Sequence, residues 1–298
     1  MADIDYFALL KKSWLDFKDN LVVVVPILIS IALGIGFLLL LGIEALIFFL
    51  VFSKTILINP KVILSPIGIS LAAVFIILDF IVGALIGSYI RSMMIGMFKD
   101  IVLYKKTSVS NMFAYGRKYI WRYFKVSLLI IAISVLPLVF LTGISTLVFL
   151  ISKIAGIIVI VLSVLILTVF FIFLMFFLFF VDPIFATEDK AAFEIIKSSF
   201  RYTKKNFAHV FFTWGVSGLV YLAINGGLRI MMLPFGFMVG FGSALSMKAT
   251  IASMIVGGFV GIISTIINIA SQLVLSLFQF NSYFAKNELH RIKKLAKV

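Results

Sequence analysis

The chain has 298 residues, of which 63% are hydrophobic and only 13% charged, with 26 Lys and Arg against 12 Asp and Glu. Soluble domains are about 45–50% apolar and about 25% charged, so the composition excludes a soluble protein. The chain has no cysteine and two histidines, which excludes disulfides, thiolate chemistry and a histidine-rich metal centre. We therefore expect a membrane protein that holds no metal and no other cofactor.

Six apolar segments account for most of the chain, and each could cross a bilayer as a helix. A helix rises about 1.5 Å per residue, so about 20 residues cross a hydrocarbon core of about 30 Å. We expect an all-α polytopic membrane helix bundle that forms a single membrane domain over residues 1–298. The expected transmembrane spans are residues 21–52, 67–90, 126–151, 154–181, 207–233 and 249–280.

The basic residues predict how the chain is oriented. The N-terminus, residues 91–125, residues 190–205 and residues 286–298 together hold 21 of the 26 Lys and Arg. Short connections rich in Lys and Arg stay on the cytoplasmic side of a membrane. We expect a multi-pass protein of the cytoplasmic (cell) membrane with both termini in the cytoplasm. Because the cations flank apolar segments, they indicate contact with the anionic inner leaflet and not nucleic-acid binding.

Three cytoplasmic segments have the pattern of amphipathic helices that lie among lipid headgroups. In residues 190–205, Phe193 and Phe200 fall on one helical face, and Lys197 and Lys204 fall on another. Each such helix is expected to turn directly into a span. The three segments are residues 3–20, 111–125 and 190–205. The expected headgroup contacts are Lys197, Arg201, Lys204, Lys205, Arg117, Lys118 and Arg122.

These segments suggest a threefold internal repeat of interfacial helix, span, short outer turn and span. Two copies also match in residues, because Lys11, Ser13 and Asn20 correspond to Lys197, Ser199 and Asn206 at a constant offset of 186 positions. Repeats of this kind occur in transporters, although a shared targeting constraint can produce the same pattern.

A motif between the fourth and fifth spans resembles one found in known families. It reads Asp182-Pro183, then Glu188-Asp189, then Ala192-Phe193-x-x-x-Lys197-Ser198-Ser199-Phe200, then Lys204-Lys205-Asn206-Phe207. The chain resembles six-span prokaryotic (archaeal and bacterial) integral membrane families of unknown function, which are related to the membrane domain fused to some glycerophosphodiester phosphodiesterases. The resemblance implies architecture and location. The phosphodiesterase catalytic domain is missing from this sequence, so the resemblance implies no activity.

Polar residues inside the apolar segments are the candidate functional residues. Counted from Ile90 and Asn281 as cytoplasmic ends, Asp79 lies 11 residues deep, Asn268 13 and Gln272 9. We expect these three to form an inner polar cluster between the second and sixth spans. Such a cluster could be an ion or proton site, or a set of hydrogen bonds that only holds helices together.

A second set of polar residues is expected near the outer interface. Glu44 lies 23 residues into the first span and Arg229 lies 22 residues into the fifth, with Asn225 nearby. Similar depth and opposite charge indicate an outer ion pair between Glu44 and Arg229. The alternative is that each side chain extends to water independently.

Glycine and proline indicate several helix interruptions and contacts. Residues 225–227, Asn-Gly-Gly, could break the fifth span, and residues 234–247 could form a re-entrant loop or a flap on the outer leaflet. Pro137 with Gly143 could interrupt the third span. The alternative for these residues, which we favour, is helix packing, because glycine and proline are frequent in membrane helices. Residues 83–87 and 257–261 contain glycines spaced for close helix contacts.

No enzymatic motif is present in the sequence, so we expect a protein that is not an enzyme. An intramembrane aspartyl enzyme would need a second acid at the depth of Asp79, and Glu44 falls about 18 Å away by helical rise. We expect a protein that organises lipids or partner proteins at the inner face, with a second copy of the chain as another partner. The alternative is a small-solute or ion transporter that uses Asp79 and the broken fifth span.

Overall fold

The computed structural model describes residues 4–56, 66–245 and 247–295, which form helices and no strands. Six helical segments of the described chain are long and apolar enough to cross a membrane, which confirms the expected all-α, multi-pass architecture. The elements are α1 (Tyr6–Lys18), the 3-10 helix η1 (Leu21–Val24), α2 (Val25–Ile56), α3 (Pro66–Tyr104), α4 (Val109–Ile151), α5 (Lys153–Leu178), α6 (Val181–Thr187), α7 (Ala192–Lys205), α8 (Phe207–Leu245) and α9 (Met247–Leu295).

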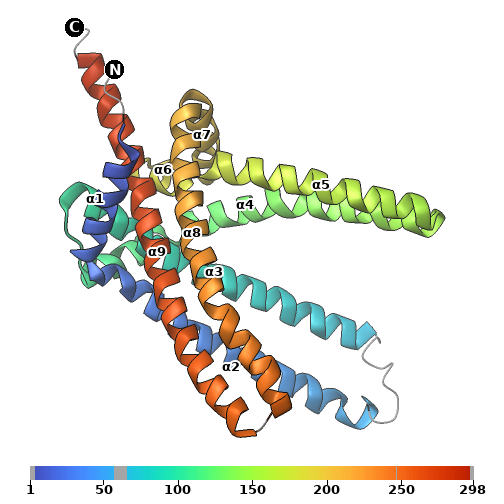
Figure 1. Ribbon diagram of the computed structural model, residues 1–298. Coiled ribbons are helices and arrows are strands. Elements are labelled where there is room, and N and C mark those ends of the chain that lie inside the picture. Colours follow the sequence, from blue (N-terminus) through green and yellow to red (C-terminus); the bar gives the residue numbers. More distant parts are fainter. Residues whose placement is uncertain (1–3, 57–65, 246, 296–298) are drawn as a thin grey trace.

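The long helices form three hairpins that share one base. The pairs are α2 with α3, α4 with α5, and α8 with α9, and the two helices of each pair run side by side (Figure 1). The hairpins diverge from one another with distance from the base. We call "the base" the short helices α1, α6 and α7 together with the adjoining ends of α3, α4, α8 and α9.

The buried core lies in the base and not along the hairpins. Phe98, Phe180, Ile195 and Leu277 are at most 1% exposed and belong to one apolar cluster. The outer parts of the hairpins instead expose large aliphatic and aromatic side chains, such as Leu150 at 76%. Side chains of this kind on a membrane-spanning helix are suited to contact with lipid.

The residue repeat has a structural counterpart in α1 and α7. Asn20 donates its side-chain amide to the carbonyl of Asp16 at 3.0 Å, and Asn206 donates in the same way to Tyr202 at 3.1 Å. Each asparagine closes a short helix and precedes a long one, and the matched serines Ser13 and Ser199 are both 0% exposed. The repeat is therefore confirmed for these two copies.

The expected interfacial helix over residues 111–125 is not a separate element. It belongs to α4, which runs without interruption from Val109 to Ile151 and passes through Pro137. Residues 117–136 contain neither glycine nor proline, so nothing in that stretch favours a turn between an interfacial segment and a span. Ser108 caps the start of α4, and its hydroxyl accepts from the backbone N–H of Asn111 at 3.2 Å.

The expected break in the fifth span is also wrong. α8 is continuous through residues 225–227 and through Pro234 as far as Leu245, so the segment expected as a loop or flap is helical. A glycine costs a helix only about 1 kcal/mol. Backbone groups released from a helix in lipid would cost several kcal/mol each, because no water is present to bind them. Ser246 lies outside the described residues.

The glycines expected at close helix contacts, either within the chain or between protomers, do not lie at contacts within the chain. A Cβ added at Gly83, Gly87 or Gly261 would meet no atom within 4 Å. Close approaches lie elsewhere. In the base, a Cβ on Gly96 of α3 would overlap the Tyr115 side chain of α4, and next to the turn of the α4/α5 hairpin a Cβ on Gly156 would overlap Phe149. Glycine thus brings helices together both in the core and at the turn of one hairpin.

Candidate lipid-binding grooves and membrane polar pairs

An apolar groove lies between α1 and the α8/α9 hairpin, next to the base. Its volume is about 550 Å³, within the range of about 300–1,000 Å³ that is usual for small-ligand sites. Lys11 is the one charged residue that lines it, and Trp14 lines it from the same helix. Aliphatic side chains supply most of the remaining wall: Leu10, Val220, Ile224, Ile267 and Val274.

Polar contacts on another face of α1 fix the helix beside this groove. Asn281 of α9 donates to the Ser13 hydroxyl at 3.0 Å and to the Asp16 carboxylate at 3.1 Å. Lys105, which follows α3, forms an ion pair with Asp16 at 3.2 Å. α1 is therefore attached to α9 and to the end of α3, and its groove-lining face is held in a defined orientation.

A second apolar groove, of about 760 Å³, lies between α2 and α9. Val24, Ile31, Ile262 and Ile269 are among its lining residues, and none of its lining residues is charged. The hydroxyl of Thr265 also lines this groove, and it donates to the carbonyl of Gly261 within α9. Nothing in the lining of this groove would bind a polar substrate.

Glu44 and Asp79 form a carboxyl pair across the α2/α3 hairpin. The two side chains lie close enough to interact with each other. Oε1 of Glu44 and Oδ1 of Asp79 are buried and make no hydrogen bond. The expected separation of about 18 Å is wrong because it placed the cytoplasmic end of the second span at Ile90. α3 continues to Tyr104, 25 residues beyond Asp79, which matches the depth of Glu44.

The expected inner and outer polar clusters are regrouped in the structure. Asn268 of α9 donates to the side-chain oxygen of Asn225 on α8 at 3.2 Å, and Gln272 donates to Asn268 at 3.1 Å. Asn268 and Gln272 thus meet as expected, but their partner is Asn225 and not Asp79. These amides join the two helices of one hairpin.

The expected ion pair between Glu44 and Arg229 is not formed. Arg229 is exposed, and it makes no ion pair within the part of the chain that the structure describes. Glu44 interacts instead with Asp79 on the neighbouring helix of its own hairpin. The two residues belong to different hairpins, which diverge from each other, so equal depth does not bring them together.

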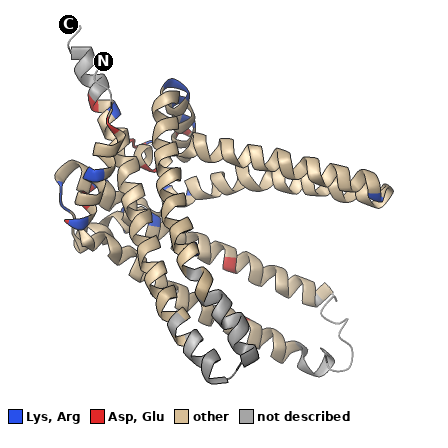
Figure 2. Ribbon diagram, viewed as in Figure 1, with Lys and Arg blue, Asp and Glu red and all other residues tan. Residues whose placement is uncertain are grey.

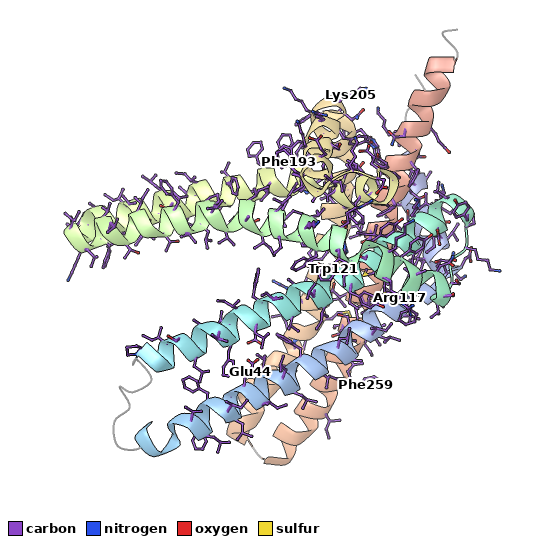
Figure 3. All side chains as sticks on the ribbon, turned by 180° about the vertical axis from the view of Figure 1, so that it is seen from behind. Glu44, Arg117, Trp121, Phe193, Lys205 and Phe259 are labelled. Carbon is purple, nitrogen blue, oxygen red and sulfur yellow. The ribbon has the colours of Figure 1, made fainter. Side chains whose placement is uncertain are left out.

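Most of the basic residues expected at lipid headgroups are exposed at the base. Figure 2 shows Lys and Arg gathered there, while the hairpins are almost free of charge. Lys205 and Phe193 lie on α7, and Arg117 and Trp121 lie on α4 (Figure 3). The exposed candidates are Lys197, Arg201, Lys204, Lys205, Arg117 and Lys118.

Arg122 differs from these because the protein itself binds it. Its guanidinium contacts Asp189, the carbonyl oxygens of Phe185 and Glu188, and the faces of the Phe185 and Tyr119 rings. The expectation of a headgroup contact is therefore wrong for Arg122. Its role is to fix the segment that joins α6 to α7 against α4.

The base contains a buried ionic contact that the sequence analysis did not identify as a site. Asp182 of α6 binds Arg91 of α3 and accepts from the hydroxyl of Tyr123 on α4 at 3.1 Å. Asp182 is the first residue of the motif on which the family resemblance rests. This motif is the feature of the sequence that could have indicated the contact. The partner of Asp182 could not be predicted from the sequence, because Arg91 is 91 positions away in the chain.

His209, near the start of α8, is also buried. Its two ring nitrogens lie 3.0 Å from the Tyr6 hydroxyl of α1 and 3.2 Å from the Ser282 hydroxyl of α9. Burial raises the pKa of Tyr6 above its ordinary value. These contacts attach the N-terminal end of α1, the helix that lines the 550 Å³ groove, to the α8/α9 hairpin.

Comparison with known proteins gives no relative for this chain: no family model matches it, and neither a curated protein nor a solved structure does so. The relationship expected from the motif that begins at Asp182 stays a prediction.

Proposed function

We propose that this protein is a non-enzymatic membrane protein that organises lipids at the inner face of the cytoplasmic membrane. The proposal rests on the two apolar grooves next to the base. The groove of about 760 Å³ lies between α2 and α9, and the groove of about 550 Å³ lies between α1 and the α8/α9 hairpin. Both termini and the base lie on the cytoplasmic side, where exposed cations meet anionic headgroups.

The physical argument is one of solvation. In a bilayer an apolar groove between membrane-spanning helices is filled by acyl chains, because water there would have no hydrogen-bonding partners. Helices that diverge expose their apolar sides to lipid, as Leu38 at 67% and Ile76 at 68% do here. A partner protein or a second copy of the chain could occupy the same surfaces, so the test below must identify the occupant.

Retention of lipid after purification tests this proposal. The protein would be extracted in mild detergent, passed through detergent exchange, and examined by native mass spectrometry. We expect phospholipid adducts that survive the exchange, together with a monodisperse protein. A chain that emerges free of lipid, or one whose surfaces are covered by a second copy or another protein, would overturn it.

A second candidate function, transport of a proton or small cation, is favoured by one observation. Glu44 is 6% exposed and meets Asp79 within the membrane, and paired acids at such depth are expensive unless they serve a task. Proteoliposomes should then show a proton or sodium flux that is lost in Glu44→Gln and Asp79→Asn. Wild-type protein that conducts neither ion would remove this candidate.

A further inference from the structure

We propose that the groove between α1, α8 and α9 binds one anionic phospholipid, with the phosphate at Lys11 and an acyl chain along the groove. The inference rests on the proposed lipid-organising function and gives it a site and a lipid class. It concerns the 550 Å³ groove only, because the larger groove is lined by no charged residue.

The first argument is the arrangement of residues along α1. Phe7, Leu10, Lys11 and Trp14 all line the groove, and their spacing of three, four and seven positions places them on one helical face. Phe7 is 76% exposed and Trp14 is 52% exposed. Aromatic side chains of this kind are favoured at the level of the headgroups, where one side meets hydrocarbon and the other meets water.

The second argument is the charge of Lys11. This lysine is exposed and makes no ion pair in the described part of the chain, and it lines the groove, whereas its neighbour Lys12 does not. Lys12 lies near Lys105 and Asp16 instead. Among the described residues, no acidic side chain lines the groove to oppose an anion. A phosphate with net negative charge therefore fits better than a zwitterionic headgroup.

The third argument is an internal comparison that the repeat provides. Phe193, Lys197 and Phe200 of α7 repeat the spacing of Phe7, Lys11 and Trp14. Lys197, however, pairs with Glu194 at 3.5 Å and lines neither groove described above. α7 thus has the same aromatic and basic pattern without a groove for an acyl chain, and Lys197 is a matched control for Lys11.

The experiment compares retention of phosphatidylglycerol and phosphatidylcholine by native mass spectrometry of detergent-purified protein. Wild type should keep one phosphatidylglycerol in preference to phosphatidylcholine. Lys11→Gln should lower this preference about fivefold, since a lysine near an anionic surface contributes about 1 kcal/mol. Lys11→Arg should restore the preference, and Lys197→Gln should match wild type. Ile224→Trp, which fills the groove, should reduce retention of both lipids.

The outcomes separate this inference from the proposed function. Wild type that retains no lipid would overturn both. If Lys11→Gln retains phosphatidylglycerol as well as wild type does, the site alone is overturned. The same holds if Lys197→Gln loses as much of this lipid as Lys11→Gln does. If Ile224→Trp does not yield monodisperse protein, the two lysine variants decide the question, because both residues are exposed and their replacement leaves the core unchanged.

Discussion

Gly96 shows how a single residue sets the distance between two helices. Its missing Cβ leaves room for Tyr115, whose hydroxyl donates to Asp100 at 2.7 Å and so holds the ring in place. We expect Gly96→Ala to destabilise the protein by about 1–3 kcal/mol, the usual cost of adding volume to a packed core. Gly83→Ala is the matched control, because its Cβ meets open space, and it should be neutral or slightly stabilising. The melting temperature in detergent measures both, and equal effects would contradict the assignment.

The ionic contact between Asp182 and Arg91 gives a second prediction for a single residue. Asp182→Asn would leave Arg91 without its partner and weaken the contact with Tyr123. We expect a loss of about 2 kcal/mol, less than the ~3–5 kcal/mol of a fully buried pair, because the Arg91 side chain is 36% exposed.

The control for Asp182→Asn is Glu194→Gln, which removes an exposed ion pair with Lys197 and should cost less than about 1 kcal/mol. Thermal unfolding of both variants in the same detergent gives the comparison. A melting temperature for Asp182→Asn that equals that of Glu194→Gln would show that the buried contact does not stabilise the base.

Individual residues also show where reasoning from sequence succeeds and fails. The polar residues in the membrane, Asp79, Asn268 and Glu44, could be identified as unusual from sequence because each interrupts an apolar run. Their partners could not be identified, since depth was counted from the ends of apolar runs and helices such as α3 continue far into the base. Depth also carries no information about which helix is adjacent.

At the scale of elements, each hairpin has at least one polar pair between its two helices in the part of the chain that the structure describes. Glu44 lies 12 residues before the end of α2, and Asp79 lies 13 residues after the start of α3. Asn225 and Asn268 lie 21 and 22 residues from Ser246. In the remaining hairpin, the hydroxyls of Ser145 and Ser163 meet at 3.0 Å. Polar groups at similar distances from one turn must meet in an antiparallel pair, so counting from the turn gives the partners.

This hairpin register can be tested because the chain contains no cysteine. Glu44→Cys combined with Asp79→Cys should be joined by a short bifunctional thiol reagent, since the two side chains meet across α2 and α3. The control pair, Glu44→Cys with Arg229→Cys, should not be joined, because these residues lie on different hairpins. A shift in electrophoretic mobility reports the link, and efficient linking of the control pair would favour the outer ion pair expected from sequence.

The elements themselves were largely predictable, and the exceptions have a common cause. Apolar length located all six spans, and residue spacing located α1 and α7 as short separate helices. The exceptions are α4, whose amphipathic first part predicts a separate interfacial helix, and α8, whose glycines and proline predict breaks; both helices are continuous. In an apolar environment the hydrogen bonds of a helix cost more to open than these residues gain by opening them.

At the scale of the whole molecule, the structure adds the arrangement of the helices, which form three hairpins that diverge from a shared base. The core that holds them together is the base, where Ile184 is 1% and Thr203 is 0% exposed. A helix that is apolar on all sides gives no pattern to indicate which side faces another helix. Sequence could therefore count the spans but could not arrange them, whereas the amphipathic spacing of α1 and α7 did indicate segments packed on one side.

The orientation of this assembly gives the last prediction. If the base lies in the cytoplasm, Lys106→Cys between α3 and α4 is shielded from outside, while Lys153→Cys at the turn between α4 and α5 faces outward. Both positions are exposed, and the absence of native cysteine removes background. An impermeant maleimide should label Lys153→Cys on intact cells, and Lys106→Cys only after permeabilisation. The reverse pattern would place the base outside, and its exposed cations would then lose the anionic inner leaflet that the proposed lipid site requires.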